Sequence, residues 1–197
     1  MASVDDLVTY ILERKGTMTS MKLQKLLYYS QAWAAAMTGG GIFPDPILAY
    51  RDGPVVYHVY KQHKRMYHVS RWPCGSSQAL DRSERELVDA VLDVYGELSG
   101  EDLSMLTHEE DPWRTARGDL PKGAYSTRPI EVSAMKNYYR GRTLGDRTVA
   151  DLVTASHWHG AGASEDEPHE SNYGRVGCAP TRKAPRRARV RSESCAT

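Results

Sequence analysis

The segment Thr107–Trp113 is the first place in the chain where side chains could do acid–base or metal chemistry. It places His108 beside three consecutive acids, Glu109, Glu110 and Asp111. Metal-binding residues on a helix usually recur four residues apart, whereas consecutive residues point in different directions. We therefore interpret the segment as a helix end whose acids favour the start of the next helix. The alternative is a hydrolase in which His108 meets Glu109 or Glu110 in a pocket.

A second cluster, His157-Trp158-His159, offers two imidazoles in alternation, a pattern that can bind a metal on a strand. No cysteine or carboxylate stands at metal-site spacing around it, so we interpret it as an ordinary tail segment. The three cysteines form no C-x-x-C pair. The chain has no G-x-S-x-G elbow, and Gly39-Gly40-Gly41 leads into no phosphate-binding Lys-Ser/Thr pair. These observations predict a protein that is not an enzyme and uses neither metal nor cofactor.

The segment Arg182–Arg191 is strongly basic, although the whole chain has a net charge of only +1. Six lysines and arginines in this run could attract nucleic-acid phosphates. No aromatic residues are interleaved for base stacking, so such contact would be independent of sequence. With almost nothing to bury, the run is expected to be a disordered basic C-terminal tail.

Aromatic residues are frequent in the first third of the chain, where Leu23, Leu26 and Leu27 form the core-facing stripe of an expected helix. Tyrosine and tryptophan are enriched both in protein cores and at binding hot spots. Those near this stripe form either a second packing face or a face for a partner. The candidates for partner binding are Tyr28, Tyr29, Trp33, Tyr50, Tyr57 and Tyr60.

Helical periodicity and capping residues predict the elements that position these side chains. A first helix is capped by Ser3 with Asp6 and stops at Gly16. A second is capped by Thr19 or Ser20 and ends at Gly39, with Lys22, Lys25 and Gln31 lying mostly off its apolar stripe. Residues 47–50 suit a short strand, and Pro54 is expected at the first position of a third helix.

The remaining elements are read in the same way. Residues 65–80 are expected to form a loop with a strand around residues 67–70, and Ser83 with Glu86 forms a capping box for a helix that runs to Gly100. Further helices are expected at residues 101–108, 112–116, 130–140 and 148–156. The predicted fold is mainly α, a single-domain helical bundle of about six to seven helices with a small β element. We predict a domain at residues 1–145 and a variable, largely disordered extension at 146–197.

Four ordered blocks resemble the Panacea (SocA-like) antitoxin domain. Residues 22–33, KLQKLLYYSQAW, resemble its KLQKLLYFAQGW signature, with Ala32 where the family usually has glycine. GPVV at residues 53–56, LTH at 106–108 with a following PW, and Tyr138-Tyr139 resemble the later blocks. The matching residues are Lys22, Leu23, Gln24, Lys25, Leu26, Gln31, Trp33, Gly53, Pro54, Val55, Tyr60, Thr107, His108, Pro112, Trp113 and Tyr139.

This resemblance implies a binding protein, found also among phage-associated proteins, that neutralises a cognate protein toxin. It also implies that an ATP-dependent protease could be a partner, with the chain acting as a proteolytic adaptor. The alternative is a nucleic-acid-associated phage or prophage regulator that uses the basic tail. Because the chain has no apolar run long enough to cross a bilayer and no signal peptide, we expect a cytoplasmic protein with no membrane partner and with reduced cysteines.

Overall fold

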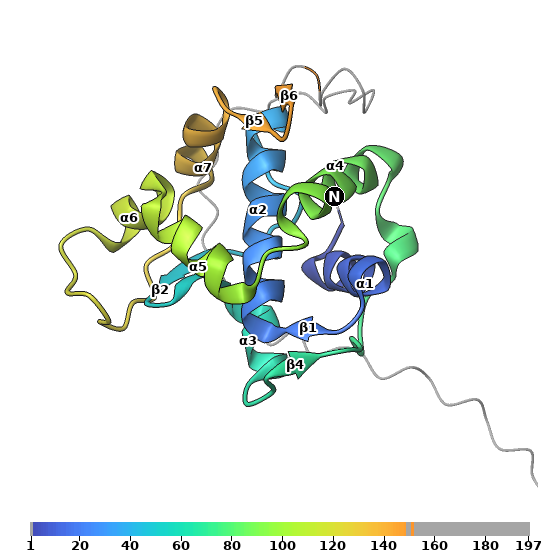
Figure 1. Ribbon diagram of the computed structural model, residues 1–197, viewed down its shortest axis with the longest axis horizontal. Helices are drawn as coiled ribbons and strands as arrows, with labels where there is room; N and C mark the ends of the chain where they lie inside the picture. The colour runs from blue at the N-terminus through green and yellow to red at the C-terminus, as the bar shows by residue number, and fades with distance from the viewer. Residues whose placement is uncertain (1, 149–150, 152–197) are drawn as a thin grey trace, which may run out of the picture. The chain divides into compact units, whose positions relative to one another are not determined.

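The computed structural model describes residues 2–148 and 151, all within one compact unit, Met1–Ser164. Its central element is the second helix, around which the others are arranged (Figure 1). In chain order the elements are α1 (Val4–Lys15), β1 (Met18–Thr19), α2 (Ser20–Thr38), β2 (Ile47–Tyr50), β3 (Gly53–Val56), α3 (Tyr57–His63), β4 (His68–Val69), a 3₁₀ turn (Ser77–Ala79), α4 (Arg82–Tyr95), α5 (Gly100–Glu109), α6 (Asp111–Arg117), α7 (Val132–Tyr139), β5 (Thr143–Leu144) and β6 (Arg147–Thr148). The mainly α fold with a small β element is therefore confirmed.

Helix α2 is buried on all sides over fourteen consecutive residues, 23–36. It contacts α1, α4, α5, α7 and the β3 strand, which explains how a 19-residue helix can lack a solvent-facing side. The prediction that Lys25 and Gln31 lie off the buried stripe is therefore wrong. Both are buried, because neighbouring elements cover every face of the helix.

The helix ends follow the predicted local rules. Ser3 and Asp6 form the predicted capping box of α1, which ends at Gly16. The Thr19 hydroxyl accepts a hydrogen bond from the Lys22 N–H and so caps α2, which ends at Gly39 in the left-handed conformation. These predictions are confirmed because each depends only on residues within one turn of the helix end.

Residues 47–56 form a two-stranded antiparallel hairpin, in which Ala49 pairs with Pro54 and Tyr50 with Gly53. The strand at residues 47–50 was predicted, but the placement of Pro54 at the start of a helix is wrong. Pro54 lies in β3, and α3 begins at Tyr57. Proline has no N–H to give to a strand ladder, yet a two-stranded sheet leaves it an edge position.

The later helices differ from the predictions mainly at their ends. The capping box of α4 is formed by Asp81 and Glu84 instead of Ser83 and Glu86, and the helix ends at Tyr95 before Gly96. A new capping box of Ser99 and Asp102 then starts α5. Strand β4 lies in the loop where a strand was expected and pairs with β1.

The β5–β6 hairpin contains the predicted domain boundary at residue 145 and buries Leu144 in the core. The expected 148–156 helix lies mostly outside the described residues, and His157–His159 and the basic run Arg182–Arg191 lie wholly outside them. Two of the three cysteines, Cys178 and Cys195, lie outside the described residues, so the expectation of reduced cysteines stays a prediction. Within the described part of the chain, no helix has the length and apolarity to cross a membrane.

Candidate functional site

Gln24 on α2 is a side-chain clamp on the end of β3. Its Oε1 accepts the Val56 N–H at 2.7 Å, and its Nε2 donates to His63 Nε2 at 2.8 Å. His63 must therefore accept at Nε2, which agrees with burial lowering the pKa of this imidazole. The family-motif glutamine thus fixes the junction between β3 and α3, which is a structural role.

Gln31, two turns further along α2, holds the chain that follows the helix. Its Oε1 accepts the N–H groups of Ile42 at 2.8 Å and Phe43 at 3.2 Å, and its Nε2 donates to the Phe43 carbonyl at 3.0 Å. All three backbone groups are buried, so they need these partners. Gln31 therefore sets the path from α2 towards β2.

Glu110 lies at the junction of α5 and α6 and is the acceptor for three buried tyrosines. The hydroxyls of Tyr28, Tyr29 and Tyr139 donate to its carboxylate at 2.8, 3.1 and 2.6 Å. Burial raises the pKa of Glu110, although the three hydrogen bonds oppose that shift. The acid–base pairing considered for Glu110 and His108 is therefore not found, because the Glu110 oxygens accept the three tyrosine hydroxyls and Glu110 does not line the cavity that contains His108.

The proposed partner face on α2 is buried. Tyr28 and Tyr29 have no exposed surface, and Trp33 is 1% exposed and packs edge-to-face on Tyr139. As candidates for partner contact these three residues are wrong, because their rings are buried in the core, where Tyr29 stacks on Tyr95 of α4 and Trp33 packs on Tyr139 of α7. Of the six predicted aromatic residues, only Tyr50, Tyr57 and Tyr60 keep surface accessible to a partner.

Lys25 is the one lysine among the largest fully buried side chains of the described residues, at 1% exposure. Its Nζ donates to the Pro54 carbonyl at 3.3 Å. Burial lowers the pKa of this amine to about 7, and the nearby Asp52 carboxylate opposes that shift. Lys25 of the first family block therefore contacts Pro54 of the second block at the β2–β3 turn.

Gly53 is required at this turn for two reasons. Its φ of +102° is rarely adopted by other residues, and an added Cβ would lie 2.5 Å from Lys25 Cε. We expect Gly53→Ala to lower the free energy of unfolding by about 2–4 kcal/mol, since strain and overpacking each cost about 1–3 kcal/mol. Urea denaturation measures this loss. Gly123→Ala is the matched control, because Gly123 has φ +85° but no atom near its added Cβ. An equal loss in both variants would contradict the role of the Lys25 contact.

The third family block ties α5 and α6 to the hairpin. Trp113 Nε1 donates to the Tyr50 carbonyl at 2.9 Å, and its ring stacks on His108 with centroids 4.2 Å apart. The Thr107 hydroxyl donates to the Ser104 carbonyl, and Pro112 lies in the first turn of α6. These contacts agree with the interpretation of Thr107–Trp113 as a helix junction.

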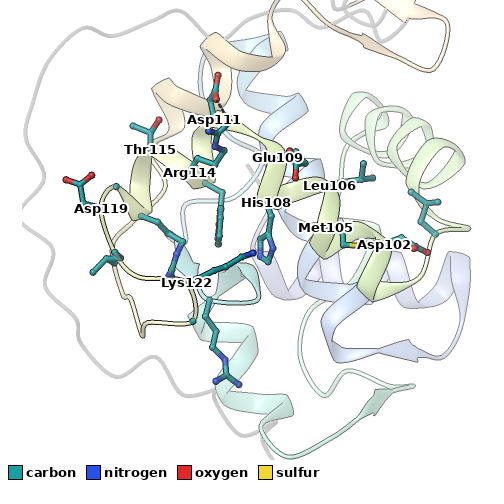
Figure 2. A pocket seen from close by; sticks show the side chains of 17 residues that line it. Asp102, Met105, Leu106, His108, Glu109, Asp111, Arg114, Thr115, Asp119 and Lys122 are labelled. Carbon is teal, nitrogen blue, oxygen red and sulfur yellow. Dashed lines mark ion pairs between the residues drawn. The ribbon is translucent and has the colours of Figure 1, made fainter.

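A groove of about 1060 Å³ lies beside His108, and we call it the His108 groove (Figure 2). Met105 and Leu106 line one side, and Arg114 and Lys122 line another. Glu109 points away from the His108 ring, and His108 Nε2 has no hydrogen-bond partner among the described residues. His108 therefore does not meet Glu109 or Glu110 in this groove, as the hydrolase alternative required, and burial lowers the pKa of its imidazole.

A second cavity, of about 390 Å³, lies on the other side of the hairpin turn and shares Arg51 and Gly123 with the groove. We call it the tyrosine pocket, because Tyr50, Tyr60 and Tyr125 line it together with Gln24, Lys25 and His63. The Tyr50 ring lies 5.8 Å from that of Tyr60 and 5.6 Å from that of Tyr125. Sequence reasoning missed Tyr125, which lies in an irregular loop without periodicity.

Exposed apolar side chains gather at these two cavities. Tyr125 is 72% exposed at the tyrosine pocket, and Tyr57, 45% exposed, stacks on Tyr60. Met105 and Leu106 are 62% and 42% exposed in the His108 groove. Large exposed tyrosine and methionine side chains beside concave surfaces are typical of protein-binding sites.

One known protein family is similar to the central part of the chain. The family model described as antitoxin SocA-like, Panacea domain, matches residues 23–114. The resemblance read from the sequence blocks is therefore confirmed over α2 to α6. An antitoxin-like domain suggests a role other than catalysis. No curated protein and no solved structure gives a significant match to the chain.

Proposed function

We propose that the protein is an antitoxin that neutralises a cognate protein toxin by binding it directly. The observation that carries this proposal is the match of residues 23–114 to the antitoxin SocA-like domain. Most family-motif residues in the structure are buried clamps, so they support the scaffold. Recognition of a particular toxin is then expected to depend on exposed residues around that scaffold.

The surface that best fits this role surrounds the tyrosine pocket and the His108 groove. These two cavities share residues, so a single partner could contact both. Tyr57 and Tyr125 offer large rigid surfaces with two rotatable side-chain angles each, which favours binding at low entropic cost. We infer that they are hot spots for the toxin.

The proposal includes delivery of the bound toxin to an ATP-dependent protease. This step requires a surface for the protease that remains free in the toxin complex. It also requires a compartment that holds ATP, so the proposed location is the cytoplasm. The degradation rate of the toxin in the presence and absence of the protein tests this extension separately from neutralisation.

We expect Tyr57→Ala combined with Tyr125→Ala to abolish neutralisation. The test is growth of cells that co-express each variant with the protein encoded beside it, which must be toxic when expressed alone. Loss of two hot-spot aromatics commonly weakens binding by about 2 kcal/mol or more per residue. The matched control is Tyr67→Ala, because Tyr67 is 73% exposed but its ring packs on His68, which lines neither cavity, whereas the Tyr57 ring stacks on the pocket-lining Tyr60. Rescue by the double variant, or a neighbour that is harmless alone, would contradict the proposal.

A further inference from the structure

Lys25 is a buried cation with unused hydrogen-bonding capacity. An ammonium group has three N–H donors, but within the described residues its only hydrogen bond is the 3.3 Å bond to the Pro54 carbonyl. Removing an ammonium from water is costly unless an anion or several acceptors replace the water. Among the described residues only this one weak acceptor bonds to the group, so the ammonium has capacity for a further acceptor.

The tyrosine pocket lies beside this cation. Two pairs of its polar residues are bonded to each other: Gln24 and His63 at 2.8 Å, and Arg51 and Asp52 at 3.0 Å. Lys25 is the buried lysine that lines the pocket, and its ammonium has donors beyond the one that bonds to Pro54. An anion entering the pocket would meet this ammonium without having to displace an existing ion pair.

We propose that the tyrosine pocket binds a carboxylate side chain of the partner protein, with Lys25 as its counter-charge. This inference rests on the proposed function and specifies the chemistry of the recognised residue, an aspartate or a glutamate. Lys25 provides the buried charge and Tyr125 provides exposed apolar surface at the same cavity, while the exposed Tyr57 stacks on Tyr60, which lines the cavity. Exposed aromatics around a buried charge suit an anchor residue on a protein better than a free small acid, because they contact the surface around the anchor.

The titration of nearby groups gives the inference a distinctive pH dependence. A carboxylate binds the ammonium form of Lys25, so affinity is expected to fall as pH rises above the pKa of about 7. The titratable and charged groups around Lys25 are Arg51 and Asp52 in the hairpin turn, His63 on α3, His108 on α5 and the pocket tyrosines Tyr50, Tyr60 and Tyr125. Burial lowers the pKa of both histidines, so above pH 7 both are expected to remain neutral while Lys25 loses its proton.

The experiment uses the full chain and a synthetic peptide, so it does not depend on the toxin. Acetyl-Ala-Glu-Ala-amide and its Gln counterpart are titrated at pH 6 and pH 9, and amide chemical shifts report the Kd. We expect the Glu peptide to bind at least about tenfold more tightly at pH 6, a preference equivalent to about 1.4 kcal/mol. The preference should shrink at pH 9 and vanish in Lys25→Met. It should persist in Lys22→Met, whose residue lies on the same helix but is partly exposed.

Several outcomes would overturn the inference. Equal affinity for the two peptides, absence of binding by either, or a Glu preference that survives in Lys25→Met each contradict it. Lys25→Gln provides a second variant, and its amide spectrum shows whether the fold is kept. Tighter binding of glutarate than of the Glu peptide would assign the pocket to a free acid and overturn the assignment to a protein partner. Peptide binding without toxin neutralisation would instead contradict only the proposed function.

Discussion

Replacing Glu110 by alanine is expected to lower the free energy of unfolding by about 3–5 kcal/mol, because it leaves three buried tyrosine hydroxyls without an acceptor. Each unsatisfied buried group costs about 1–3 kcal/mol. Because the hydroxyls come from α2 and α7 while Glu110 joins α5 to α6, the loss affects the packing of four helices at once. Urea denaturation of the two proteins measures the difference.

The matched control for this prediction is Glu109→Ala. Glu109 precedes Glu110 in the chain but is exposed, so its removal is expected to change stability by less than about 0.5 kcal/mol. Tyr139→Phe removes one of the three donors and is expected to cost about 1 kcal/mol. A Glu110→Ala protein as stable as the Glu109→Ala protein would show that the tyrosine cluster does not depend on this carboxylate.

Replacing Lys25 by methionine is expected to stabilise the protein, most strongly at low pH. The folded-state pKa of Lys25 is lowered from 10.5 to about 7, so folding at pH 6 requires a charged amine to be buried. Between pH 7 and 10.5 the unfolded chain holds a proton that the folded chain does not. The contribution of Lys25 to the free energy of unfolding therefore rises with pH above 7 and is lost as the pH falls towards 7.

The measurement is the stability of the wild type minus that of Lys25→Met, taken at pH 6 and pH 9. Titrations of other groups largely cancel in this difference. From pH 6 to pH 9 the free energy of unfolding of the wild type is expected to rise by roughly 2–3 kcal/mol relative to that of the variant, because folding lowers the pKa of Lys25 to about 7. A flat difference for Lys25→Met, or one that falls with pH, contradicts the described burial of this amine.

Such a lysine weakens the fold that it belongs to. Well-packed apolar residues often stabilise a protein when they replace a buried charge. Ionisable groups with strongly shifted pKa values beside a cavity are commonly found at functional sites. The prediction of higher stability in Lys25→Met and that of lost peptide preference therefore test two consequences of the same arrangement.

The sequence predicted those features that local rules determine. The caps at Ser3, Thr19 and Gly39 were predictable because each depends on contacts within one helical turn. Pro54 was misplaced because its position in β3 depends on pairing across the hairpin, and a proline followed by apolar residues also suits a helix start. The capping box of α4 was also misplaced, because Asp81 with Glu84 and Ser83 with Glu86 have the same spacing and only the first pair starts the helix.

The polar interior of α2 could not be predicted from periodicity. A lysine or glutamine in an amphipathic pattern is normally assigned to solvent. Gln24 bonds to residues 32 and 39 positions away, and Tyr28 to a carboxylate 82 positions away, so only the tertiary structure reveals them. The resemblance to the antitoxin domain indicated that these residues matter but did not distinguish buried clamps from partner contacts.

The central claim, that this domain binds a toxin through the face formed by the two cavities, is tested most directly by one affinity measurement. The purified chain and the protein encoded beside it are titrated by calorimetry, with wild type and the Tyr57→Ala/Tyr125→Ala variant compared. The proposal predicts a wild-type Kd of about 1 μM or tighter and an affinity at least about a hundredfold weaker in the variant. No binding by the wild type, or equal affinity in the two proteins, contradicts the proposal.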